Sequence, residues 1–340
     1  MMKPDHISPG KKRILFGVGG YAAGLINALD PHTLEGLDFL AMDRYDAFPP
    51  DWDPAYLIPM KSINPHIGRS DSVLSARDAE DALSQNMGLF DSTSFVFLIA
   101  ALGGACASGA APIVLKHLKR SGIPSFAFLT MPSQEIEGRK KWMIANHALN
   151  DIRNFCTNFL IVPAHSENES MISTYQEDST QSNLFKLQFL LDLLRLPALV
   201  PCDVSWFGSW NAHAERTGLI IAEGTGSDRA ADATCRILAD HEIKPFIKRP
   251  CTILMQFMTS VDLTLKDLDE ATGILRKSWQ NDIEIHYSVI NHDTLHTSSM
   301  RLGVIVGDSS GSTVNRTHES TVKPPVLIDP IQQAGQSPSF

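Results

Sequence analysis

The sequence lacks several features that mark whole classes of protein. None of its apolar runs reaches the roughly 18 residues that a membrane-spanning helix needs, and its polar first residues are unlike a signal peptide. The five cysteines are odd in number and scattered, with no CxxC pair, so neither a zinc site nor a disulfide framework is expected. The formal net charge is −9, which argues against nonspecific nucleic-acid binding. We therefore expect a cytoplasmic globular protein without direct membrane insertion.

The most informative segment that is present covers residues 95–112, FVFLIAALGGACASGAAP. A hydrophobic run typical of a buried strand ends in a stretch of small residues, Gly103–Gly109, and a helical pattern follows with Pro112 near its expected first turn. A bulk-free loop at a helix N-terminus lets backbone N–H groups surround a phosphate. A tight strand–helix turn that binds nothing has the same pattern, and this segment alone does not decide between the two.

A second glycine loop follows the first expected strand. Gly17, Gly19 and Ala22 satisfy the pattern G-x-G-x-x-G/A, and Asp43 lies at the end of the next expected strand, where a ribose partner would lie. This pattern makes an oxidoreductase that binds a dinucleotide one hypothesis. It leaves the loop Gly103–Gly109 unexplained, however, and a di- or triphosphate held between both loops fits at least as well.

Strand-like runs alternate with helical patterns through the first half of the chain. This alternation predicts an α/β fold, in which helices cover both faces of a parallel sheet and ligands bind at the carboxyl ends of the strands. Leucines at helical spacing then predict one long helix over residues 178–196, and a mixed α+β region follows. The strands are expected at 13–17, 37–42, 94–100, 125–130, 157–162, 217–223, 251–259, 283–289 and 300–306, and the remaining helices at 21–29, 71–87, 111–119, 138–153, 228–240 and 265–280.

Seven collinear segments resemble FtsZ, the bacterial relative of tubulin, over about Arg13 to Gly307. They are GVGG at Gly17–Gly20, NPHIGR at Asn64–Arg69, LGGACASGAAP at Leu102–Pro112, EGRK at Glu137–Lys140, DLLRLPALVPCD at Asp192–Asp203, EGTGSDRAADA at Glu223–Ala233 and VDLTLKDLDEA at Val261–Ala271. The resemblance argues against the dinucleotide hypothesis. It implies an N-terminal extension (1–12), a Rossmann-like GTP-binding domain (13–177), a central helix (178–196), a C-terminal tubulin/FtsZ-like domain (197–307) and a disordered tail (308–340).

In FtsZ, GTP or GDP is bound with its phosphates in the loop that corresponds to Leu102–Gly109, and Mg²⁺ is expected to bridge them. The family pattern GGGTGTG is GGACASG here: Ser108 keeps the hydroxyl of the family's threonine, and Ala105, Cys106 and Ala107 depart from the pattern. Alanine at a glycine position costs little where φ is negative and a good deal where φ is positive. The residues implied to hold nucleotide are Gly19, Gly20, Tyr21, Gly103, Gly104, Ala105, Cys106, Ala107, Ser108, Gly109, Glu137, Arg139 and Thr180.

Some of these positions carry a second interpretation. Glu137 and Arg139 match the acid and arginine that meet ribose and nucleotide in FtsZ, although a surface ion pair of little energy is the alternative. Thr180 falls where the family has an acid that reads guanine, and a hydroxyl cannot pair with the N1–H and N2 groups of guanine as a carboxylate can. The resemblance therefore leaves the preference for guanine open.

The family motif N-x-D-x-x-D enters the nucleotide site of the next subunit and positions the attacking water. Here Asp203 survives as the expected catalytic residue, while Pro201 and Trp206 replace the asparagine and the second acid. Since phosphoryl transfer depends on positioning and charge stabilisation, and tryptophan can neither orient nor deprotonate water, hydrolysis is expected to be slow or absent. An N-cap of the following helix is the alternative role of Asp203.

The resemblance implies a guanine-nucleotide-binding protein that assembles head to tail into filaments, because a heterologous interface that does not close is repeated without end. Cell division or membrane remodelling would be its setting. An apolar segment at Val326–Ile331 of the tail is a possible docking peptide for a membrane-anchor protein. The alternative is a scaffold that binds nucleotide poorly or not at all and acts through its partners.

Overall fold

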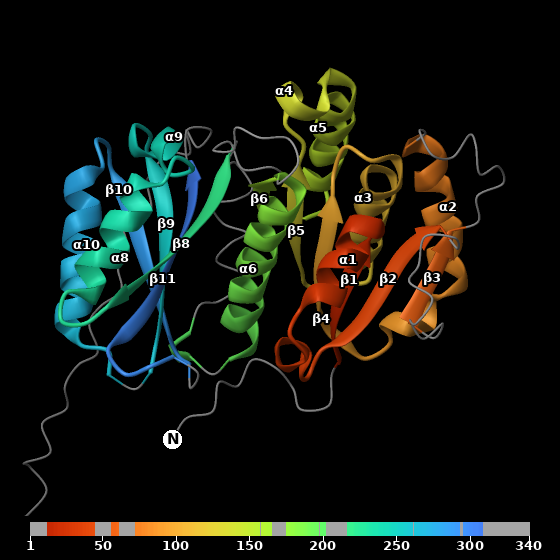
Figure 1. Cartoon of the computed structure of the whole chain (residues 1–340). Coiled ribbons are helices and arrows are strands. Elements are labelled where there is room, and N and C mark those ends of the chain that lie inside the picture. Colours follow the sequence, from red (N-terminus) through yellow and green to blue (C-terminus); the bar gives the residue numbers. More distant parts are fainter. Residues whose placement is uncertain are drawn as a thin grey trace, which may run out of the picture.

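The computed structural model describes residues 12–44, 56–60, 72–156, 158–164, 175–196, 198–201, 216–260, 262–292 and 295–308. Figure 1 shows two sheets side by side, with the long helix α6 (Tyr175–Arg195) between them. Within these residues, no helix combines the length and the apolar character that crossing a bilayer requires.

The first sheet has six strands in the order β3-β2-β1-β4-β5-β6, and every neighbouring pair is parallel. This arrangement confirms the predicted α/β class. Strand β3 was not predicted, because its four residues carry too little periodicity to be seen in the sequence. The strands are β1 (Lys12–Val18), β2 (Asp38–Arg44), β3 (Leu57–Met60), β4 (Thr93–Ala101), β5 (Ser125–Met131) and β6 (Phe159–Pro163).

Helices cover both faces of this sheet, as the alternation of side chains along a strand requires. Ile14 and Phe16 of β1 point into a core formed with α2, α3 and α5, whereas Leu15 points into a core formed with α1 and α6. Figure 1 shows α4 and α5 rising above the carboxyl ends of the strands. The helices are α1 (Gly20–Ala28), α2 (Ser72–Gln85), α3 (Ala105–Arg120), α4 (Gln134–Glu137) and α5 (Arg139–Arg153), with short 3₁₀ turns at Pro31–Leu34 and Met87–Phe90.

Helix α3 corrects one expectation. It begins at Ala105, six residues before the predicted start, so Pro112 lies inside the helix instead of near its first turn. A proline within a helix removes the hydrogen bond to the carbonyl four residues earlier, here that of Ser108. Packing of the small residues before Pro112 against the strands outweighs this loss, and such packing cannot be read from a local proline signal.

The second sheet has five strands in the order β7-β10-β9-β11-β8, with one parallel pair and three antiparallel pairs. The predicted mixed α+β character is thus confirmed, and β9 has the predicted bounds. Helices α8 and α10 cover one face, and α6 covers the other. The elements are β7 (Ala198–Val200), β8 (Thr217–Thr225), α8 (Arg229–Ala239), α9 (Lys244–Ile247), β9 (Cys251–Thr259), α10 (Leu265–Ser278), β10 (Ile283–Asn291) and β11 (Ser299–Asp308).

Helix α6 joins the two sheets through one continuous core. Leu187 and Leu190 are buried in the same cluster as Phe97 of the first sheet and Leu254 of the second. The approach to β11 is close, because a Cβ atom at Gly303 would overlap the ring of Phe189.

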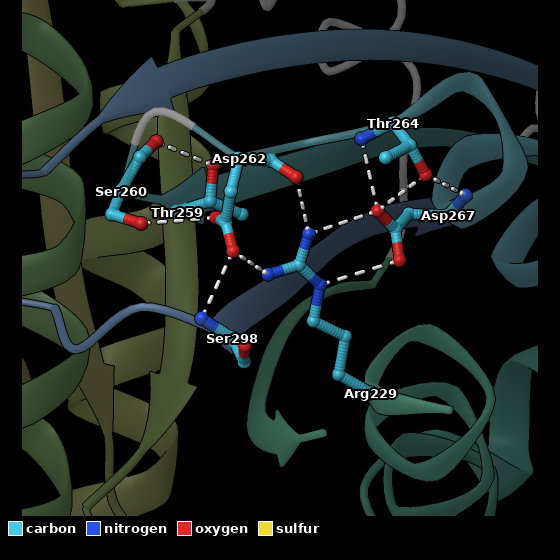
Figure 2. Close-up of polar contacts among 7 residues, drawn as sticks. All are labelled: Arg229, Thr259, Ser260, Asp262, Thr264, Asp267 and Ser298. Carbon is cyan, nitrogen blue, oxygen red and sulfur yellow. Dashed lines mark hydrogen bonds and ion pairs between the residues drawn. The ribbon is translucent and has the colours of Figure 1, made fainter. Parts of the chain in front are cut away.

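A buried ion-pair network ties the second sheet's loops together (Figure 2). Arg229, 5% exposed, donates Nη1 to Asp262 at 2.7 Å and Nη2 to Asp267 at 3.0 Å. Asp262 also accepts the amide of Ser298 at 2.9 Å, and Asp267 forms a capping box with Thr264 at the start of α10. The network therefore joins the start of α8, the β9–α10 connection and the β10–β11 turn.

Replacing the guanidinium group of Arg229 measures how much this network contributes to the stability of the fold. In Arg229→Met the carboxylates of Asp262 and Asp267 lose their cation, and we expect a loss of about 3 kcal/mol in the free energy of unfolding in urea, followed by circular dichroism. Arg236→Met on the same helix removes only the exposed pair with Asp232 and should cost less than about 0.5 kcal/mol. Equal losses in the two variants would contradict a stabilising role for the network.

The same network predicts a pH dependence. Burial raises the pKa of Asp262 and Asp267, but hydrogen bonds from Arg229 and the loop residues outweigh burial, so both pKa values lie below the ordinary value. A carboxylate with a lowered folded-state pKa stabilises the fold above its unfolded pKa of about 3.9, and the contribution is lost as pH falls below that value. As the pH falls from about 5 to about 3, the free energy of unfolding in urea should decrease more steeply for the wild type than for Arg229→Met.

Candidate functional site

The candidate site lies at the carboxyl ends of the adjacent strands β1 and β4. Gly19 and Gly104 are the N-cap residues of α1 and α3, and a glycine has no side chain with which to cap a helix. The first-turn amides of both helices therefore lack a capping side chain, and the positive ends of two helix dipoles lie at the same sheet edge. Such an edge favours an anion.

The two glycine loops touch. A Cβ atom at Gly19, where φ is +87°, would lie 3.3 Å from the Cβ of Ala107. Gly103 has φ +100°, and a Cβ atom there would lie 2.9 Å from Cγ of Pro132 and 3.3 Å from the carbonyl of Lys141. At Gly104 the corresponding space is open, with nothing within 4 Å. Gly103 is thus required by its conformation and neighbours, whereas Gly104 borders free space.

The departures from the glycine-rich family pattern lie in the first turn of α3. Ala105 and Ala107 have the negative φ of a helix, so alanine carries no conformational cost there. Ser108 accepts the amide of Gly103 at 2.8 Å and so helps to hold the turn. Burial raises the pKa of the Cys106 thiol, and the nearby charge of Asp43 raises it further, so Cys106 stays a neutral thiol. Gly109 allows α2 to approach, since a Cβ atom there would overlap the carbonyl of Ser72.

Tyr21 and Thr180 meet across the space between α1 and α6. The Tyr21 hydroxyl accepts Nδ2 of Asn183 at 3.2 Å and hydrogen-bonds to Thr180. Burial raises the pKa of Tyr21 and outweighs the hydrogen bonds with Asn183 and Thr180, so the hydroxyl is neutral near pH 7. Asn183 is 2% exposed and also donates to the carbonyl of Pro163 at 3.2 Å. Sequence reasoning missed Asn183, although an amide on the apolar stripe of a long helix was a signal.

The segment around Gly138 forms the rim beside Gly103. Glu137 accepts Nζ of Lys141 at 2.8 Å, which is an i,i+4 pair with a half-exposed lysine, and Arg139 is exposed at the first position of α5. Glu137 thus forms an ion pair with Lys141 in the first turn of α5. Asp203 and Trp206 lie outside the described residues, and their roles stay predictions.

Comparison with known proteins relates this chain to one family. Residues 62–176 match the family described as Tubulin/FtsZ family, GTPase domain. Cell division protein FtsZ of Caulobacter vibrioides is 21% identical over 337 residues, covering 94% of this chain and 64% of the relative, and FtsZ 1 of Rhizobium meliloti is 24% identical over 306 residues, covering 84% and 50%. These matches support a divergent FtsZ-like protein of the tubulin superfamily. The chain spans between half and two thirds of the length of these relatives.

Solved structures agree on the fold. An FtsZ dimer of M. jannaschii matches with a TM-score of 0.72 at 17% identity, covering 88% of this chain and 89% of that one. CetZ1 from Haloferax volcanii, a GDP-bound monomer, matches with 0.68 at 16% identity, covering 90% and 96%. CetZ2 from the same organism, a GTPγS-bound protofilament, matches with 0.65 at 17% identity, covering 89% and 94%.

Two neighbouring glycines should respond differently to alanine. Gly103→Ala forces a side chain into positive φ against Pro132, and we expect a loss of about 2 kcal/mol in the free energy of unfolding. Gly104→Ala at φ −85° meets open space and should cost less than about 1 kcal/mol. Urea unfolding of the nucleotide-free proteins measures both, and the reverse order would show that the turn is not held as described.

Proposed function

We propose that this FtsZ-like chain binds a guanine nucleotide across the N-termini of α1 and α3 and assembles head to tail into filaments. The observation that carries the proposal is the contact between the Gly19 loop and Ala107 of α3, which brings two glycine-started helices to one sheet edge. The GDP-bound CetZ1 and the GTPγS-bound CetZ2 protofilament, which share the fold, support it.

Each part of the site has a role in this proposal. First-turn amides of α1 and α3 bind the phosphates, with Gly20 and Gly104 leaving room for them. Glu137 and Arg139 on the rim contact ribose and nucleotide. Thr180 and Tyr21 lie where the base would meet α6, and because both are neutral, we expect the discrimination of guanine from adenine to be smaller than a carboxylate would give.

Mg²⁺ would neutralise the phosphates in such a site, and hydrolysis would be slow. Asp203 of a neighbouring subunit is the one expected acid beside the attacking water, because Trp206 replaces the other. Positioning dominates phosphoryl transfer, so the loss of one acid reduces turnover without abolishing binding. Filaments of the cytoplasmic protein would then persist, and the tail beyond residue 308 would dock to a membrane-anchor protein in cell division or membrane remodelling.

A nucleotide-poor scaffold is the second candidate. Tyr21 favours it, because its side chain fills a position that is glycine in the family and its hydroxyl is already bonded to α6. Such a chain would keep the fold and the filament contacts while nucleotide binds weakly or not at all.

Calorimetry on nucleotide-free protein separates these candidates. We expect GTP and GDP to bind in the presence of Mg²⁺ with micromolar or lower dissociation constants, and ATP to bind no more tightly. Gly104→Ala places a methyl group before the first amides of α3 and should weaken GTP binding about tenfold, equal to about 1.4 kcal/mol. Gly273→Ala on α10 also meets open space, far from the site, and serves as the matched control.

Light scattering and phosphate release test the remaining steps. Wild-type protein with GTP should scatter light and release phosphate slowly, and Trp206→Asp should raise the turnover. Failure of GTP, GDP and ATP alike to bind the wild type would reject the proposal and leave the scaffold.

A further inference from the structure

A tyrosine bridges α1 and α6 beside the candidate site. Tyr21 is the second residue of α1, directly after Gly20, and its ring packs against the core that α1 and α6 share. Its hydroxyl oxygen accepts Nδ2 of Asn183 at 3.2 Å and hydrogen-bonds to Thr180, and both partners belong to α6. The side chain therefore joins the first turn of α1 to α6.

The α6 side chains that reach Tyr21 are fully used by these contacts. An asparagine amide has two N–H donors, and Nδ2 of Asn183 donates both to Tyr21 and to the carbonyl of Pro163, each at 3.2 Å. Asn183 is 2% exposed, so its amide is closed to a ligand while Tyr21 stays in place. The hydroxyl of Thr180, which is half-buried, bonds to the same phenol. In the described part of α6, the polar groups bonded to α1 are thus committed to Tyr21.

The side of the site that would face phosphates is open, in contrast. Gly19 and Gly104 leave the first-turn amides of α1 and α3 without a capping side chain, and a Cβ atom at Gly104 would meet nothing within 4 Å. Amides at helix N-termini bind phosphate oxygens whatever group the phosphates carry. The site therefore offers donors to phosphates, and a neutral ring separates it from the polar groups of α6.

This asymmetry determines which part of a ligand can be recognised. A site that hydrogen-bonds a ligand group rejects an analogue without that group by about 10⁴-fold, because its own polar groups are then left unpaired. A base that lies outside the contact between Tyr21 and α6 forms no such bond there. Displacement of Tyr21 would leave a buried N–H of Asn183 without its acceptor, which opposes opening of the contact. The phosphates then supply most of the binding energy.

We propose that Tyr21 closes the base-binding side of the site, so that the site recognises a triphosphate group and does not select the base attached to it. Its ligands are then nucleoside triphosphates of any base and inorganic tripolyphosphate, which share the recognised group. The proposal rests on the proposed function, because it assumes that the amides of α1 and α3 hold phosphates. It goes further by assigning the loss of base selection to one side chain.

Calorimetry with Mg²⁺ on nucleotide-free protein tests the proposal. GTP, ATP and UTP should bind the wild type with dissociation constants within about threefold of one another, and inorganic tripolyphosphate should displace GTP. Tyr21→Ala removes the ring and frees the polar groups of Asn183 and Thr180. Because a purine reaches further into the opened space than a pyrimidine, GTP and ATP should then bind more than about threefold tighter than UTP. Tyr21→Phe keeps the ring and should keep the wild-type pattern.

Tyr287→Phe is the matched control, because it also removes a hydroxyl that bonds to a threonine, here Thr272 at 3.1 Å between β10 and α10. It should leave every dissociation constant unchanged. Selective binding of GTP by the wild type, or failure of tripolyphosphate to displace GTP, would overturn the proposal and leave the proposed function standing. A Tyr21→Ala variant that is folded by circular dichroism but keeps the wild-type pattern would also overturn it. If none of the four ligands binds the wild type, the proposed function fails as well.

Discussion

The relative placement of the two sheets depends on one helix that is packed between them. Helix α6 packs against the first sheet and the second sheet at once, and Leu187, Leu190 and Phe189 are each almost fully buried. Its approach to β11 requires the absence of a side chain at Gly303. Because a single core passes through the helix, neither sheet has a complete hydrophobic face without it, and the position of the candidate site relative to the second sheet is fixed by this packing.

Most of the fold could be predicted from the sequence because its signals are local. Long apolar runs gave the central strands of both sheets, and β9, buried along its whole length, was predicted with its observed bounds. Strands β3 and β7 were missed, since a strand of four or three residues has almost no periodicity and exists through pairing with a neighbour. The start of α3 was missed because a proline signal was given more weight than packing that depends on distant residues.

The candidate site divides in the same way. The importance of Gly19 and Gly103 could be predicted, because both have a positive φ, a conformation that glycine adopts far more readily than other residues. Asn183 could not be assigned to Tyr21, since that contact joins residues 162 positions apart. Asp43 was noticed only as a ribose partner, and its proximity to Cys106 became visible only when β2 and α3 were placed side by side. A residue's backbone conformation can thus be predicted from the local sequence, whereas the partners of its side chain depend on which distant segments the fold brings together.

Because α6 is uninterrupted, it also fixes the spacing between contacts that the helix makes with the two halves of the molecule. Asn183 meets Tyr21 near the middle of α6, and Oδ2 of Asp192 lies 3.5 Å from Nε2 of His292 near its C-terminal end, nine residues along the same helix. At 1.5 Å per residue this separation is about 14 Å, and each residue added or removed would also turn one end by about 100° relative to the other. The number of residues between these two contacts therefore sets both the distance and the rotation that relate the two halves of the molecule. During divergence, loops can change their length freely, but this helix can change only its side chains.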